Sequence, residues 1–90
     1  MKLIDILVRE LPNRGGWPNG VAEITQDADG SLCIWKLHGA QCNSGYWSHS
    51  SGVGLLQYWS GMNAMPGSED GRESIITKDK YEAALAASKL

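Results

Sequence analysis

Ninety residues are enough for one domain and too few for two, so residues 1–90 are expected to fold as a single domain. Apolar residues make up 42% of the chain and charged residues 20%, which excludes a disordered chain. The formal net charge is −2, and Lys and Arg are scattered from Lys2 to Lys89 without a basic run, which disfavours a nucleic-acid polymer as a partner.

The first predicted element is an amphipathic helix near the N-terminus. Its apolar positions recur at helical spacing: Leu3, Ile4, Leu7, Val8 and Leu11. Pro12 and the breaker run 13–16 end it. The apolar run 3–8 is interrupted by Asp5 and is too short for a signal peptide or a membrane span. We therefore expect a cytoplasmic protein that does not bind a membrane.

The clearest local signal is a β-hairpin in the sequence VAEITQDADGSLCIWKL, residues 21–37. Two β-prone runs flank residues 27–30, which supply the Asp and Gly residues that a tight turn requires. Residues 39–45 are expected to form a loop. Residues 46–48 are expected to form a short strand, and residues 53–59 a further strand.

The C-terminal third is predicted to contain a loop over 60–73, a short extended segment over 74–76 and a helix. Thr77 is a natural N-cap for that helix, Asp79 lies in its first turn, and Ile76 is expected to pack on Tyr81. The chain therefore predicts an α+β fold: an N-terminal helix, a small antiparallel sheet of three to four strands, and a C-terminal helix.

Two of the predicted strands are apolar on both faces. In residues 32–37, Leu32 and Ile34 point to one side while Cys33 and Trp35 point to the other, and residues 55–59 show the same pattern. Two short helices can cover only one face of the sheet, so loops, a second subunit or a ligand must cover the other. This pattern predicts a homo-oligomer.

The aromatic residues are unusual, because the chain has four Trp and three Tyr but no Phe. Each of these side chains has a polar group beside its apolar ring, as is typical of surfaces that meet a polar partner. Trp35 and Trp59 are interpreted as core residues. Trp17, Tyr46 and Trp47 lie at turn or loop edges beside glycines and are candidates for binding.

The segment GYWSHSSGVG, residues 45–54, concentrates these candidates. Tyr46 and Trp47 would stack on a planar ring, and His49 would donate a hydrogen bond. Ser48 and Ser50, with the neighbouring glycines, would place O–H and N–H groups around an anion. The segment therefore predicts a nucleotide pocket, half of it contributed by a second copy. The alternative is a loop that merely orders two core aromatics.

Other chemistries have weaker support. Cys33, His38, Cys42 and His49 are suitable zinc ligands, but their spacing matches no common zinc pattern, and no metal or cofactor is expected. The Asp-x-Asp-Gly turn at 27–30 lacks the remaining calcium ligands. A small hydrolase that uses His49 as a base is a third possibility, although no nucleophile elbow is present.

Two segments resemble small accessory proteins of tailed phages and prophages of enteric bacteria. These segments are the hairpin ITQDADGSLCIW and the ending IITKDKYEAALAAS, and the resemblance covers roughly residues 21–37 and 74–88. Both motifs are structural, so they carry no site residues across. The resemblance implies expression in the cytoplasm of an infected bacterium, and proteins of this kind often inhibit host defence.

Together these expectations describe a non-enzymatic phage-encoded binding protein that counters host defence. Sequestration of a small nucleotide-like signal is the first hypothesis, with Trp47, Tyr46, His49, Ser48, Ser50 and Trp17 as ligand-binding residues. The alternative is a protein-interaction module that masks a host protein through an exposed Trp/Tyr patch.

Overall fold

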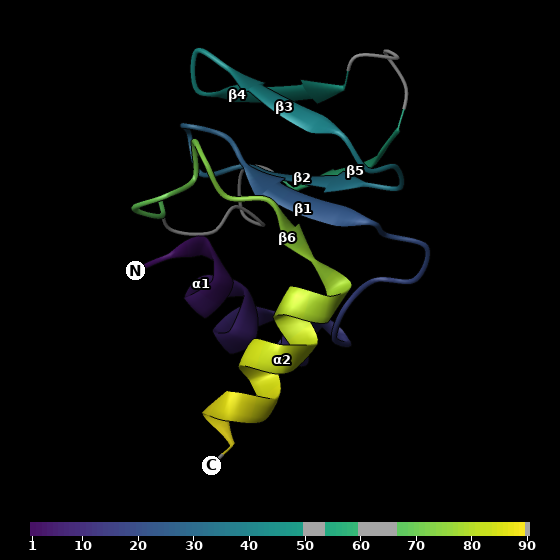
Figure 1. Cartoon of the computed structure of the whole chain (residues 1–90), viewed down its shortest axis with the longest axis vertical. Coiled ribbons are helices and arrows are strands. Elements are labelled where there is room, and N and C mark those ends of the chain that lie inside the picture. Colours follow the sequence, from purple (N-terminus) through teal and green to yellow (C-terminus); the bar gives the residue numbers. More distant parts are fainter. Residues whose placement is uncertain (50–53, 60–66, 90) are drawn as a thin grey trace.

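Two helices, a four-stranded sheet and a separate two-stranded hairpin are stacked in three layers (Figure 1). The structure is a computed structural model that describes residues 1–49, 54–59 and 67–89. In the view of Figure 1 the hairpin lies above the sheet and the helices lie below it. The predicted α+β class is confirmed.

The N-terminal helix α1 spans Leu3–Glu10 and continues as a 3-10 turn, η1, over Leu11–Arg14. Pro12 does not end the chain's helical course at once, because a proline in the first turn of a helix needs no N–H partner. Gly15 then adopts a positive φ of 93° and stops the turn. Four apolar side chains of this segment are fully buried: Leu3, Ile6, Leu7 and Leu11.

The main sheet contains β1 (Glu23–Gln26), β2 (Leu32–Trp35), β5 (Leu55–Trp59) and β6 (Ile76–Thr77), in the order β5-β2-β1-β6. All of its neighbouring strands are antiparallel. The predicted hairpin is confirmed as β1 and β2, with Asp27 N donating to Ser31 O at 2.8 Å across the turn. Gly30 closes the turn with a φ of 92°, which a side chain would disfavour.

A second hairpin, which we call the upper hairpin, consists of β3 (Ala40–Asn43) and β4 (Tyr46–His49). The predicted short strand at 46–48 is confirmed as part of β4, but the expectation of a loop over 39–45 is wrong. Ser44 and Gly45 both have positive φ values, 55° and 87°, as in the two-residue turns that connect antiparallel strands. The turn therefore sets residues 40–43 opposite β4, although they are not β-prone.

The C-terminal helix α2 spans Lys78–Ser88 and begins as predicted. The Thr77 side-chain oxygen accepts a hydrogen bond from Lys80 N at 3.3 Å, and Asp79 lies in the first turn. Tyr81 is buried and belongs to the same apolar cluster as Ile76. No helix in the described ranges is long and apolar enough to span a membrane.

We expect Thr77→Ala to lower the free energy of unfolding by about 1 kcal/mol, because the first turn of α2 loses its side-chain acceptor. Urea denaturation of the variant and the parent measures this difference. Thr77→Ser is the matched control, since it keeps the hydroxyl. Identical midpoints for Thr77→Ala and the parent would show that the cap does not stabilise α2.

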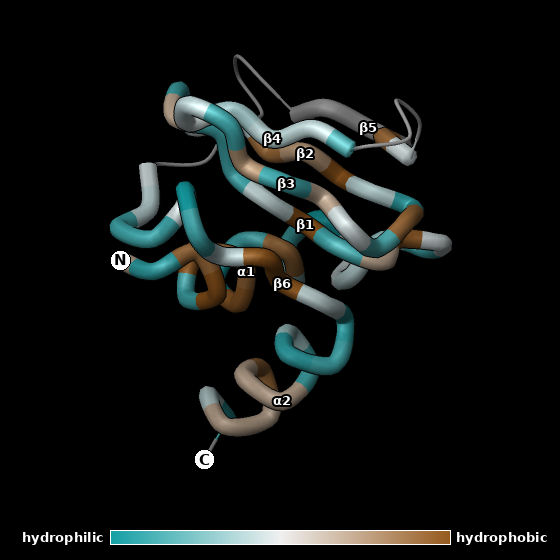
Figure 2. The backbone as a smooth tube through the Cα atoms, turned by 45° about the horizontal axis from the view of Figure 1, so that its top comes forward, coloured by the Kyte–Doolittle hydropathy of each residue, from teal (hydrophilic) through white to brown (hydrophobic). Residues whose placement is uncertain are grey.

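The sheet separates two apolar cores, as its alternating residues predicted. Leu32 and Ile34 face the helices, whose apolar residues lie beneath the sheet in Figure 2. Cys33 and Trp35 face the upper hairpin, where they pack with Ala40 and Trp47. A segment of the same chain thus covers the second face of β2. The side chains of residues 56–59 lie outside the described part of the structure.

Candidate functional site

The predicted binding segment, residues 45–54, belongs mainly to the upper hairpin. Gly45 lies in its turn, and residues 46–49 form β4. Residues 50–53, and with them the predicted role of Ser50, lie outside the described residues. Gly54 directly precedes β5 and donates its carbonyl to Lys36 N, at 2.7 Å. The described part of the segment is therefore a strand rather than an open loop.

Trp47 is a core residue, so the expectation that it lies at the mouth of a pocket is wrong. Its side chain is 9% exposed, and its indole Nε1 donates to Gln26 O at 3.0 Å and to Gly71 O at 2.9 Å. The backbone N–H of Trp47 donates to Asp27 Oδ1 at 2.8 Å. Trp47 thus ties the upper hairpin to β1 and to the segment 67–73, and its polar groups are already used.

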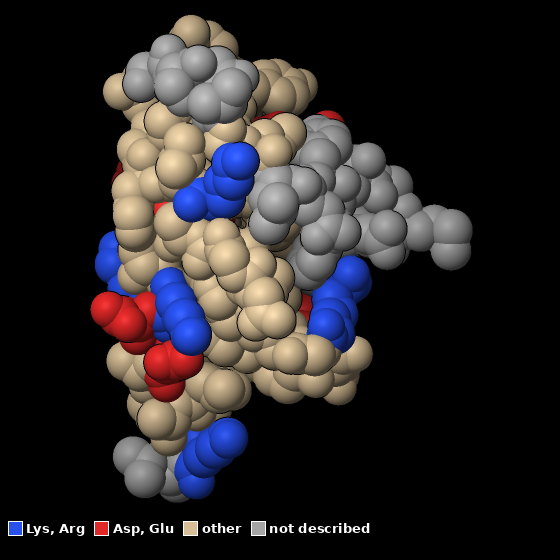
Figure 3. Space-filling model, turned by 90° about the vertical axis from the view of Figure 1, so that its right-hand side faces the viewer, with Lys and Arg blue, Asp and Glu red and all other residues tan. Residues whose placement is uncertain are grey.

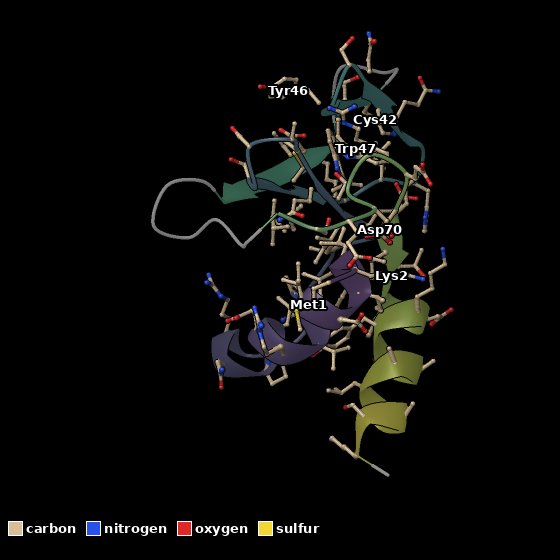
Figure 4. All side chains as sticks on the ribbon, turned by 90° about the vertical axis from the view of Figure 1, so that its left-hand side faces the viewer. Met1, Lys2, Cys42, Tyr46, Trp47 and Asp70 are labelled. Carbon is tan, nitrogen blue, oxygen red and sulfur yellow. The ribbon has the colours of Figure 1, made fainter. Side chains whose placement is uncertain are left out.

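Tyr46 has the opposite placement, with 55% of its surface exposed. Figure 4 shows its ring directed away from the molecule, whereas Trp47 lies between the upper hairpin and the sheet. Successive residues of a strand point to opposite faces. Tyr46 and Trp47 therefore cannot line one pocket, which corrects the predicted arrangement of two stacking platforms.

The outward side of the upper hairpin, which we call the outer face, carries only uncharged polar residues and Tyr46. Its exposed residues are Gln41, Asn43, Tyr46 and Ser48. The strand register pairs Gln41 with Ser48 and Asn43 with Tyr46, so these four residues form a single patch. Such a patch provides hydrogen-bonding groups around one aromatic ring.

Two buried carboxylates of β1 hold the upper hairpin on the sheet. Glu23, 6% exposed, accepts hydrogen bonds at Oε1 from Gly39 N and Ala40 N, both at 3.1 Å. Asp27, 7% exposed, accepts from Trp47 N. Sequence reasoning did not identify these anchors, although residues 23, 25 and 27 alternate onto one face of β1. Their role appears only once the upper hairpin lies above that face.

His49 is also bound within the protein. Its Nε2 lies 2.7 Å from His38 O, and because a carbonyl oxygen only accepts, Nε2 carries a proton in this contact. The imidazole lies beside Trp35, with ring centroids 6.3 Å apart. Ser48, the adjacent strand residue, is exposed on the other side of β4. This geometry does not pair Ser48 with His49 as nucleophile and base.

Trp17 lies in the other core, apart from the upper hairpin. It packs against the apolar cluster that contains the helices, and its ring lies 5.6 Å from that of Tyr81. Its Nε1 donates to Val21 O at 2.9 Å. The structure therefore does not bring Trp17 together with Tyr46, Ser48 or His49.

A cavity of about 230 Å³ lies between the turn 26–28 and the segment 67–73. Four carboxylates line it (Asp27, Glu69, Asp70 and Glu73), against one guanidinium, that of Arg72. This balance opposes a phosphate-bearing ligand. A second cavity of about 220 Å³ lies near the start of α2. No residue of β4 lines either cavity.

The cysteines lie in the core beneath the upper hairpin. Burial, reinforced by the nearby charge of Asp27, raises the pKa of the Cys33 thiol to about 12, so it is protonated at neutral pH. Cys42 is half-buried against the same cluster. Within the described ranges, no three His, Cys, Asp or Glu side chains converge on a metal-binding arrangement.

The described surface carries its charges in a dispersed way. On the face shown in Figure 3, Lys and Arg side chains are separated by uncharged surface and by Asp and Glu, rather than gathered into a basic patch. Comparisons with protein-family models, with curated proteins and with solved structures gave no match.

Proposed function

We propose that this protein is a non-enzymatic binding module that contacts another protein through the outer face of the upper hairpin. The observation that carries the proposal is the contrast between two adjacent residues. Trp47 is buried and its donors are used inside the protein, while Tyr46 is 55% exposed among uncharged polar residues. The outer face thus supplies an aromatic anchor that the fold itself does not require.

The chemistry of the outer face supports a protein partner. Tyr offers a large, rigid contact area with few rotatable bonds, and Ser and Asn offer adaptable hydrogen bonding, as on the binding surfaces of antibodies. Interface centres are depleted in charge, and the outer face has none. By comparison, a nucleotide would find one exposed ring here and no basic group among Gln41, Asn43, Tyr46 and Ser48.

The resemblance to phage accessory proteins gives this proposal its biological setting. A partner would then be a protein of the bacterial host, met in the cytoplasm of the infected cell, and binding would mask a surface that host defence needs. Sequestration of a nucleotide-like signal stays the second candidate. It would rest on Tyr46 as the stacking surface.

The test compares the parent with Tyr46→Ser as immobilised baits in lysate of an enteric bacterium. We expect a specific host protein to be captured by the parent, and the Tyr46→Ser variant to bind it with at least about thirtyfold weaker affinity, as for a hot-spot residue. Ala86→Ser, on the exposed side of α2, is the matched control and should bind as the parent does.

Equal capture by the parent and Tyr46→Ser would contradict the proposal. Because Tyr46 is largely exposed, the melting temperature of Tyr46→Ser should match that of the parent, so unfolding cannot explain a loss of binding. A nucleotide panel titrated against the parent separates the second candidate. Nucleotide binding that is lost in Tyr46→Ser, without protein capture, would favour sequestration.

A further inference from the structure

Strand β5 lies at the edge of the main sheet. It pairs with β2 on one side, and within the described ranges 1–49, 54–59 and 67–89 no strand pairs with its other side (Figure 1). An open edge presents unpaired N–H and C=O groups, which only another extended segment can satisfy in a regular way.

The direction of the backbone groups in β5 follows from its pairing with β2. Lys36 N donates to Gly54 O at 2.7 Å, and the register places Ile34 opposite Gln57 and Leu32 opposite Trp59. In an antiparallel pair, alternate residues direct both backbone groups to the same neighbour. Gln57 and Trp59 therefore bond to β2, and the backbone groups of the two intervening residues, 56 and 58, point to the open edge.

This edge lacks the usual protection against pairing. Natural edge strands carry Lys, Pro or inward-pointing charges, whereas the sequence of β5 is LLQYW, without a charge or a proline. The register shift beside Leu55 leaves the rest of the strand in continuous pairing with β2. Leu55 is 48% exposed and Leu37 is 39% exposed, and Leu37 lies against Gly54 at the start of β5. Exposed leucines thus adjoin the open edge.

We propose that β5 pairs antiparallel with β5 of a second copy of this chain, around a two-fold axis at Gln57. Residue 56 of one copy then lies opposite residue 58 of the other, and the outward backbone groups of both strands are satisfied by about four hydrogen bonds. An identical uncharged strand meets no electrostatic repulsion, and a two-fold axis closes the assembly at two copies.

Several observations favour a second copy as the occupant. The strand is self-complementary in the antiparallel direction, and the exposed Leu55 and Leu37 of each copy would lose contact with water at the same junction. The result is one continuous sheet with four strands from each copy. This interface is separate from the outer face of the upper hairpin, so it extends the proposed function rather than depending on it.

Charge reversal at the two-fold axis tests the pairing, because residue 57 of one copy lies opposite residue 57 of the other. We expect the parent to be a dimer by sedimentation velocity at tens of micromolar. Gln57→Lys and Gln57→Glu alone should each raise the dimer dissociation constant by about tenfold, since like charges then face each other. An equimolar mixture of the two variants should form the mixed dimer with the affinity of the parent or better.

The matched control is Ala86→Lys on α2, which should dimerise as the parent does. A monomeric parent at this concentration would overturn the proposal and would mean that another segment of the chain, or another protein, occupies the edge. Single variants that dimerise like the parent would place the dimer contact elsewhere. A mixture that stays monomeric, with circular dichroism spectra matching the parent, would overturn the two-fold axis at Gln57. Loss of host-protein capture in Tyr46→Ser is read independently of all three results.

Discussion

Trp47→Ala is expected to lower the free energy of unfolding by about 3–5 kcal/mol, a large share of the stability of a small domain. The substitution leaves a cavity in the core between the sheet and the upper hairpin. It also removes the indole donor from Gln26 O and Gly71 O. Urea denaturation, followed by far-ultraviolet circular dichroism, measures the loss.

The neighbouring residue provides the control for this result. Tyr46→Ala changes a ring of similar size on the same strand, but one that is 55% exposed, so the change in unfolding free energy should stay within about 0.5 kcal/mol. Trp47→Phe should lie between the two, since it fills much of the volume but has no N–H. If Trp47→Ala denatured like the parent, the buried placement of Trp47 would be refuted and the sequence-based pocket would regain support.

Glu23→Ala is expected to cost about 2–3 kcal/mol, because Gly39 N and Ala40 N lose their shared acceptor and Ala40 is buried. Glu23→Gln should cost less, since the amide oxygen still accepts. Hydrogen exchange at the Ala40 amide should accelerate in Glu23→Ala more than exchange at amides of α1. This difference would locate the loss at the upper hairpin.

An exposed carboxylate serves as the matched control for Glu23. Glu82→Ala, on α2, removes a charge whose nearest cation is Lys78 at 3.9 Å, and it should change the unfolding free energy by less than about 0.5 kcal/mol. If Glu23→Ala behaved like Glu82→Ala, the buried carboxylate would not hold the upper hairpin on the sheet.

Local signals in the sequence were sufficient to predict most of the fold. The β1–β2 hairpin has its turn residues at 27–30, and α2 has Thr77 as its cap, so each is determined within a few residues. Strand β3 was missed because Gln41, Cys42 and Asn43 have little strand preference. Its extended form depends on pairing with β4 and on the bonds that Glu23 makes before Ala40.

The candidate site was harder to predict than the fold. Treating residues 45–54 as an open loop let Tyr46 and Trp47 share one pocket, whereas the alternation of a strand places them on opposite faces. That alternation was available from the sequence once 46–48 was taken as a strand. The anchoring by Glu23 and Asp27 was not available, because it requires the upper hairpin to be stacked on β1.

The alternation of the upper hairpin also bears on how this protein can change over evolutionary time. Cys42 and Trp47 point inward and carry the packing, while Gln41, Asn43, Tyr46 and Ser48 point outward and, apart from their strand pairing, support little of it. Substitutions at the four outward positions can therefore accumulate with little loss of stability. A lineage under pressure from a changing partner could alter its specificity there in single steps, each variant remaining folded.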